Sequence, residues 1–370
     1  MIARLSHRAP LVAAVCTVLA VFALAACADR SRRTSAPGPT TSAPSTSASS
    51  TGASSTAAPV SSTARANTID DLYASTTAAT RATGRSSAGR IRTPDGRTRT
   101  YRVYVPSSLV AGQPAPLLVA LHGGLGSSAQ FEENSGFDAL AEANRFVVVY
   151  PDGIGSRPDG TGPQTWNGGY CCGPAARDRV DDVGFIRRLL DALGTELNLD
   201  PARIYAAGHS NGAIMAYRLA CELADRIVAI GVQAGSLGVD TCTPARPVSV
   251  IHLHGTADTN HPIDGGAGNG VAGVAFRPAR AAVEALAAAD GCAAIPVAAT
   301  VPSNRDLAVT TWTACRSGTE VRYVIVEGAT HAWMGHPAAS AAGEAFVGEP
   351  YRGFDASRAI WSFLAAHPRR

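Results

Sequence analysis

The pentapeptide Gly208-His209-Ser210-Asn211-Gly212 places a serine between two glycines, a spacing that suits a nucleophilic hydroxyl. The pattern alone is weak evidence, because 37 of the 370 residues are glycine. Its context strengthens it: an apolar run, residues 204–207, precedes the serine, and a stretch with helical spacing, residues 213–223, follows. The sequence therefore predicts a sharp strand–turn–helix with Ser210 as nucleophile, rather than a glycine-rich turn with a capping serine.

A serine hydroxyl needs a general base, and the base needs a carboxylate to orient it. In the strand–turn–helix setting the three residues follow in the chain order Ser, Asp, His. Asp258 comes just after the apolar run 248–253, and His331 just after the run 321–326. We expect both to lie at the same sheet edge as Ser210, with Asp258 orienting His331. The competing residues are Asp264 for the acid and His336 and His261 for the base.

An acyl-transfer site also needs two N–H donors for the oxyanion. We expect one from Asn211 and one from Gly124, with Gly123 as the alternative, since His122-Gly123-Gly124 follows the apolar run 117–121. Trp166 and Trp333 are expected to form a wall of the substrate site, although internal packing is a competing interpretation of Trp166. The remaining expected site residues, which line or support the site through hydrogen bonds, are His209, His252 and His254. This chemistry requires no metal and no organic cofactor.

The elements that must position these residues are short apolar runs alternating with helical stretches. A β-hairpin is expected around Pro94-Asp95-Gly96. Six apolar runs suit strands buried on both faces: 116–121, 146–150, 203–207, 228–232, 248–253 and 321–326. Helical spacing is found at 182–197, 213–223, 278–288 and 356–366. The sequence predicts an α/β fold: a mostly parallel sheet with helices on both faces and a ligand site beyond the strands' carboxyl ends.

The N-terminal quarter of the chain differs in composition from the rest. Two arginines, a short apolar run and Leu24-Ala25-Ala26-Cys27 predict a lipoprotein signal peptide over residues 1–26 and lipidation of Cys27. An ordinary signal peptide with an incidental cysteine is the alternative. Residues 27–88, rich in Ser, Thr, Ala and Pro, are expected to be a disordered tether, and residues 89–370 the catalytic domain.

Charge and cysteine content restrict the partners and the compartment. A net charge of +3, with no dense Lys/Arg cluster in the globular part, argues against nucleic acid as a partner. Without Cys16 in the signal and Cys27, six cysteines remain, a number that suits disulfides in an exported protein and allows fifteen pairings. We expect Cys292 to pair with Cys315. The neighbours Cys171 and Cys172 are then expected to pair separately with Cys221 and Cys242.

Six blocks, in order along the chain, resemble those of a known enzyme group. They are His122-Gly123-Gly124, Trp166-Asn167-Gly168-Gly169 with Cys171-Cys172, Val180-Asp181-Asp182-Val183-Gly184-Phe185-Ile186, the Ser210 pentapeptide, His254-Gly255-Thr256-Ala257-Asp258 and His331-Ala332-Trp333. Together they are similar to the polyhydroxybutyrate depolymerase and feruloyl esterase group, related to carbohydrate esterase family one, and especially to its actinobacterial lipoprotein branch. The resemblance covers about residue 89 to the C-terminus. It departs from the group at Met334, where a proline is usual.

The resemblance implies an α/β-hydrolase fold and ester hydrolysis through an acyl-enzyme on Ser210, with Asp258 and His331 completing the triad. We therefore expect an exported, lipid-anchored serine esterase, located outside the cell and held at the membrane by Cys27. Its substrates would be carboxylic esters, including polymeric ones: polyhydroxybutyrate-type polyesters or feruloyl and acetyl esters. The alternatives are an acyltransferase of the same fold that acts on cell-envelope lipids, and a non-catalytic surface lipoprotein.

Overall fold

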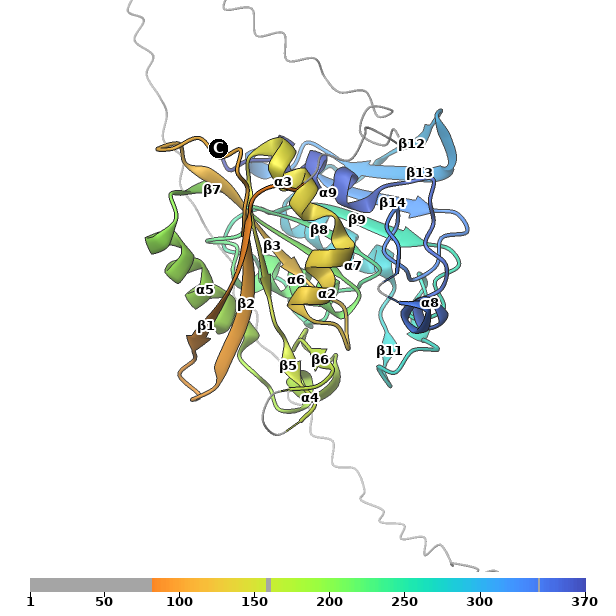
Figure 1. Cartoon of the computed structure of the whole chain (residues 1–370). Coiled ribbons are helices and arrows are strands. Elements are labelled where there is room, and N and C mark those ends of the chain that lie inside the picture. Colours follow the sequence, from red (N-terminus) through yellow and green to blue (C-terminus); the bar gives the residue numbers. More distant parts are fainter. Residues whose placement is uncertain (1–81, 158–160, 339) are drawn as a thin grey trace, which may run out of the picture. The chain divides into compact units, whose positions relative to one another are not determined.

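The computed structural model describes residues 82–157, 161–338 and 340–370 (Figure 1). The predicted signal peptide, Cys27 and nearly all of the predicted tether lie outside these residues. Every described residue belongs to one compact unit. Within the described ranges, no helix is long and apolar enough to cross a membrane.

A ten-stranded sheet runs through the described unit in the order β1-β2-β4-β3-β7-β8-β9-β14-β13-β12. The strands from β4 to β14 in this order pair in parallel, and the pairs toward both edges are antiparallel. This is the α/β-hydrolase fold, as predicted. The strands are β1 (Arg85–Arg92), β2 (Thr98–Val105), β3 (Ala115–Leu121), β4 (Val147–Pro151), β7 (Leu199–His209), β8 (Ala229–Gln233), β9 (Ser249–Gly255), β12 (Val297–Val301), β13 (Asn304–Trp312) and β14 (Val321–Val326).

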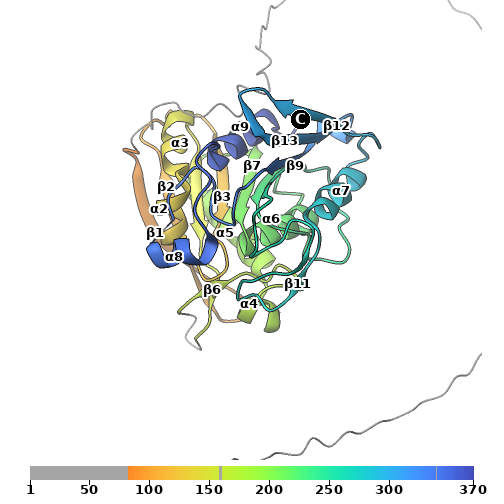
Figure 2. The same cartoon turned by 90° about the vertical axis from the view of Figure 1, so that its right-hand side faces the viewer.

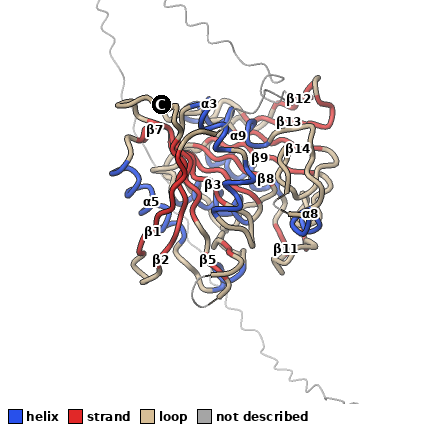
Figure 3. The backbone as a smooth tube through the Cα atoms, in the orientation of Figure 1, coloured by secondary structure: helices blue, strands red, loops and turns tan. Residues whose placement is uncertain are grey.

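Helices cover both faces of the sheet because the central strands are apolar on both sides, and β3, β4, β8 and β9 are buried along their whole length. One apolar cluster joins the sheet to α5 (Asp182–Glu196), α6 (Asn211–Glu222) and α7 (Ala279–Ala289). A second joins its other face to α2 (Ser128–Ser135), α3 (Phe137–Asn144) and α9 (Ala356–Ala366). Figure 3 distinguishes the strands of the sheet (red) from the helices (blue).

Short elements lie at the edge formed by the carboxyl ends of the parallel strands, in the loops that follow these strands (Figure 2). They are β5 (Ile154–Gly155), β6 (Gln164–Thr165), α4 (Gly173–Arg177), β10 (Gly266–Ala267), β11 (Ala275–Phe276) and α8 (Ala341–Val347). Because parallel strands end together, the residues that follow β7, β9 and β14 meet at this edge.

The predicted strands and helices are found within a few residues of their expected bounds, whereas the eight-residue helices α2 and α3 were not predicted. Strand β1 begins at Arg85, four residues before the expected start of the catalytic domain at residue 89. Strands β12 and β13 were not predicted. They form an antiparallel edge of the sheet in which Val297 and its neighbours are exposed, unlike the central strands.

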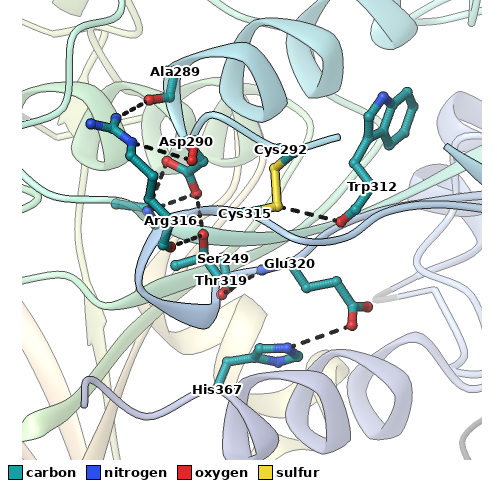
Figure 4. The surroundings of a disulfide bond; sticks show 11 residues. Ser249, Ala289, Asp290, Cys292, Trp312, Cys315, Arg316, Thr319, Glu320 and His367 are labelled. Carbon is teal, nitrogen blue, oxygen red and sulfur yellow. Dashed lines mark hydrogen bonds and ion pairs between the residues drawn. A yellow bond between two sulfur atoms is a disulfide. The ribbon is translucent and has the colours of Figure 1, made fainter. Parts of the chain in front are cut away.

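Two disulfides differ from the expected pairing. Cys292–Cys315 forms as predicted and ties the end of α7 to the turn between β13 and β14, where Thr319 also bonds to the Asp290 carboxylate at 2.9 Å (Figure 4). The other two predicted pairs are wrong: Cys171 bonds to Cys172, and Cys221 to Cys242. The peptide bond between Cys171 and Cys172 is cis.

Candidate active site

Ser210 lies in the sharp turn between β7 and α6, as the pentapeptide predicts. Its φ of 55° and ψ of −120° are uncommon for a residue with a side chain and mark a strained turn. Two close backbone approaches explain the flanking glycines. A Cβ on Gly208 would stand against the Gly212 carbonyl, and a Cβ on Gly212 against the carbonyls of Leu121 and His122. The turn presents the hydroxyl at the N-terminal end of α6.

The structure brings Ser210, His331 and Asp258 together in one hydrogen-bonded row. His331 Nε2 lies 2.9 Å from Ser210 Oγ, and His331 Nδ1 lies 2.7 Å from Asp258 Oδ2. Asp258 and His331 are 4% and 5% exposed, so water hardly competes for these bonds. Burial alone would raise the pKa of Asp258, but His331 and the hydrogen bonds that this carboxylate accepts hold its pKa below the ordinary value.

The competing residues lie elsewhere. His336 Nε2 pairs with the Asp355 carboxylate at 3.2 Å, and the His261 ring stacks on Phe276 with centroids 3.9 Å apart. Asp258 rather than Asp264 meets His331. The Asp258 Oδ1 oxygen accepts the backbone N–H groups of Asn260 and His261 at 3.0 and 2.8 Å, which fixes the carboxylate in its loop.

Gly124 and Asn211, the expected oxyanion-hole residues, both line a cavity with Ser210. A Cβ on Gly124 would lie 3.6 Å from the Asn211 Cβ, which places the two residues side by side. The glycine loop is braced by His122, a residue with no role in the sequence prediction beyond its place in the loop. His122 Nδ1 donates to the Gly123 carbonyl at 2.8 Å, and its Nε2 accepts the Gly153 N–H at 3.0 Å. Burial lowers the pKa of His122, which agrees with a neutral ring.

Trp166 does not form a wall of the substrate site, and that prediction is wrong. Its side chain is fully buried behind the oxyanion loop, where the indole N–H donates to the His122 carbonyl at 3.0 Å. The Asn211 side chain bonds to the Trp166 backbone twice: Oδ1 accepts its N–H at 2.7 Å, and Nδ2 donates to its carbonyl at 3.0 Å. Trp166 therefore anchors Asn211 and His122 instead of touching a ligand.

Two cavities of about 260 and 250 Å³ meet at Ser210. The residues common to both are Gly124, Leu125, Ser210, His331 and Phe346. The first extends toward α4 and β11 along Thr165, Pro174, Val271 and Phe276. The second extends toward α2 and α8 along Phe131, His209, Trp333, Pro337 and Val347. An ester bond placed at Ser210 would therefore have mostly apolar space on each side.

His209 and Trp333, expected beside the site, do line the second cavity. His209 Nε2 donates to the His331 carbonyl at 2.7 Å and so holds the backbone of that residue. Burial first, and the neighbouring His331 second, lower the pKa of His209 to about 3, so its ring is neutral. The Trp333 indole N–H donates to Ser357 Oγ at 2.9 Å, and its ring packs edge-on against Phe131.

A buried carboxylate, an imidazole and a serine hydroxyl in this order, at the carboxyl edge of an α/β-hydrolase sheet, form the arrangement of a serine hydrolase. Comparison with known proteins agrees with that class. The family model described as esterase PHB depolymerase matches residues 99–267. The resemblance to the polyhydroxybutyrate depolymerase and feruloyl esterase group is confirmed over that span.

Two curated relatives carry esterase or depolymerase names. Feruloyl esterase B of Piromyces equi is 32% identical over 241 residues, which are 63% of this chain and 42% of the relative. Poly(3-hydroxyalkanoate) depolymerase C of Paucimonas lemoignei is 32% identical over 122 residues, 33% of this chain and 28% of the relative. The chain thus spans less than half the length of these relatives.

Among solved structures, the acetyl xylan esterase from Aspergillus awamori aligns with this chain. It is 15% identical in sequence, with a TM-score of 0.48 over 65% of this chain and 93% of that one.

Proposed function

We propose that this chain is a serine esterase that hydrolyses carboxylic esters through an acyl-enzyme on Ser210. The observation that carries the proposal is the continuous row from Ser210 Oγ through His331 to Asp258, with bonds of 2.9 and 2.7 Å. The similarity to esterases over residues 99–267 supports the same reaction class.

In the proposed mechanism, His331 Nε2 takes the Ser210 proton as the hydroxyl attacks the ester carbonyl. Asp258 accepts the Nδ1–H of His331 and stabilises the imidazolium that forms. The N–H groups of Asn211 and Gly124 bind the oxyanion, and His331 then protonates the leaving alcohol. Water, activated by the same imidazole, releases the acid and regenerates Ser210. Loss of one oxyanion donor typically costs about 3 kcal/mol of transition-state stabilisation.

The two cavities support a substrate with bulk on both sides of the ester bond. Polyhydroxybutyrate-type polyesters and feruloyl esters have that shape, and acetyl esters use only one side. Leu125, Val271 and Phe346, which are 46%, 67% and 41% exposed, add apolar surface around the cleft. We therefore place polyester or feruloyl substrates ahead of acetyl esters.

The test is labelling with a fluorophosphonate, together with hydrolysis of p-nitrophenyl esters, methyl ferulate and a polyhydroxybutyrate suspension. We expect the wild type to be labelled and to hydrolyse at least one ester, and Ser210→Ala to do neither. Product analysis with and without an added alcohol separates hydrolysis from acyl transfer. A wild type that resists the probe and all of these esters would refute the proposal.

We further propose that the enzyme is exported and held at the outer face of the membrane by lipidated Cys27, with the residues between Cys27 and strand β1 as the tether. The lipobox-like Leu24-Ala25-Ala26-Cys27 supports this location. Expressed in an actinobacterial host, the wild type should enter the detergent phase of a Triton X-114 extraction. Cys27→Ser should shift to the aqueous phase or remain unprocessed, with unchanged ester hydrolysis by the folded domain. Wild type in the aqueous phase would contradict the anchor.

A further inference from the structure

Three fully buried polar side chains lie in one row between helix α6 and the loop that carries Asp258. They are Tyr217 on α6, and His252 and His254 on β9, each 0% exposed. The two histidines are two residues apart, so they lie on the same face of the strand. A buried polar group left without a partner destabilises the fold, which makes the hydrogen bonding of this row decisive.

The row is continuous from end to end. The Tyr217 hydroxyl lies 2.7 Å from His252 Nδ1, and His252 Nε2 lies 3.1 Å from His254 Nδ1. His254 Nε2 then reaches the His261 backbone carbonyl at 2.8 Å and stands 3.6 Å from Asp258 Oδ2.

The His261 carbonyl, at one end of the row, determines which nitrogen of each histidine carries a hydrogen. A carbonyl oxygen can only accept, so His254 Nε2 must carry a hydrogen. Burial lowers the pKa of His254 and lowers that of His252 well below its ordinary value, so both rings are neutral. His254 Nδ1 is therefore an acceptor, His252 must donate from Nε2, and its Nδ1 accepts the hydroxyl hydrogen of Tyr217.

At the end of the row opposite Tyr217, the His261 backbone makes two hydrogen bonds, one through its N–H and one through its carbonyl. The His261 N–H donates to Asp258 Oδ1 at 2.8 Å, while its carbonyl accepts from His254. The backbone of His261 is thereby fixed between the Asp258 carboxylate and strand β9. A shift of His261 would move Asp258, and with it the hydrogen bond of 2.7 Å to His331.

We propose that Tyr217, His252 and His254 are positioning residues, which form a one-directional hydrogen-bond chain that clamps the His261 carbonyl and so holds Asp258 against His331. The inference rests on the proposed esterase function of Ser210. The chain touches no substrate and instead acts through the Asp258 loop. A misplacement of about 1 Å at a catalytic group can cost about 100-fold in rate, which is the scale on which such a clamp matters.

A pair of substitutions at one position tests the clamp. The amide nitrogen of glutamine can take the place of His Nε2, and that of asparagine the place of Nδ1. His254→Gln keeps the donor to His261 and should retain kcat within about threefold, whereas His254→Asn loses it and should lower kcat by about 10- to 100-fold with KM within about twofold. Equal kcat for the wild type and His254→Asn in a folded, fluorophosphonate-reactive protein would overturn the proposal.

The proton order is tested without any turnover. In protein labelled with ¹⁵N-histidine, His252 and His254 should both appear as neutral Nε2–H tautomers, assigned through spectra of variants at the two positions. Tyr217→Phe removes the hydroxyl donor but leaves the His261 carbonyl in place, so His252 should keep its Nε2–H tautomer. An Nδ1–H tautomer at either histidine of the wild type would refute the chain. A wild-type protein with this proton order but without esterase activity would refute the proposed esterase function and leave the hydrogen-bond chain supported.

Discussion

Asp258→Asn should disable the site through the tautomer of His331 rather than through loss of a contact. The Asp258 Oδ1 oxygen accepts two backbone N–H groups, from Asn260 and His261. An amide can keep those two bonds only by placing its oxygen there, which turns its NH₂ group toward His331 Nδ1. His331 must then accept at Nδ1 and carry its hydrogen on Nε2, where it cannot take the Ser210 proton.

We expect kcat to fall by about 10⁴, because a carboxylate-to-amide exchange that reverses the tautomer has an effect of that size in a serine triad. This loss corresponds to about 5 kcal/mol of activation free energy. The assay is the hydrolysis of p-nitrophenyl butyrate, with the fluorophosphonate labelling rate as a second readout. Asp264→Asn, in the same loop, is the matched control and should leave kcat unchanged. A kcat for Asp258→Asn within tenfold of the wild type would show that this reasoning is wrong.

Three further predictions concern the surroundings of Ser210 and the stability of the domain. Trp166→Phe removes the indole donor to the His122 carbonyl and should lower kcat by about tenfold through the oxyanion loop, with KM nearly unchanged in p-nitrophenyl ester assays. Val271→Ser with Phe346→Ser should raise KM for long-chain esters about fivefold and leave p-nitrophenyl acetate unaffected, whereas the more exposed apolar pair Ile295→Ser and Val297→Ser, away from the cleft, should change neither. Burial raises the pKa of Asp138 to about 7, so this carboxyl favours folding only while protonated and opposes it increasingly as pH rises from 4 toward 7. Asp138→Asn should therefore raise Tm more at pH 8 than at pH 4 in thermal unfolding, and an equal change at both pH values would contradict the shift.

The positions of the triad could be predicted because they depend on chain order and on where buried strands end. The apolar runs before Ser210, Asp258 and His331 become β7, β9 and β14, and parallel strands end at a common edge. Sequence therefore placed three residues, 121 positions apart at the extremes, at one site.

The prediction failed where the outcome depends on packing in three dimensions. Trp166 follows no buried strand, and nothing in its neighbourhood shows that its indole turns toward His122 rather than toward a ligand. The pairing of Cys221 with Cys242 depends on how the chain returns after β8. The sequence indicates a supporting role for His252 and His254, two histidines close to Asp258 in the chain. Their order and direction follow only from the distances between rings.

The site relies on backbone groups as much as on side chains, and this accounts for its many buried polar residues. His209 holds the carbonyl of His331, His254 holds that of His261, and His122 bonds to the carbonyl of Gly123. In each case a neutral imidazole donates to the loop that carries a catalytic group. A neutral ring suits the task, because a buried charge beside His331 would disfavour the imidazolium that forms during catalysis. The lowered pKa values of His209 and His254 therefore suit the reaction as well as the fold, because both rings stay uncharged near His331.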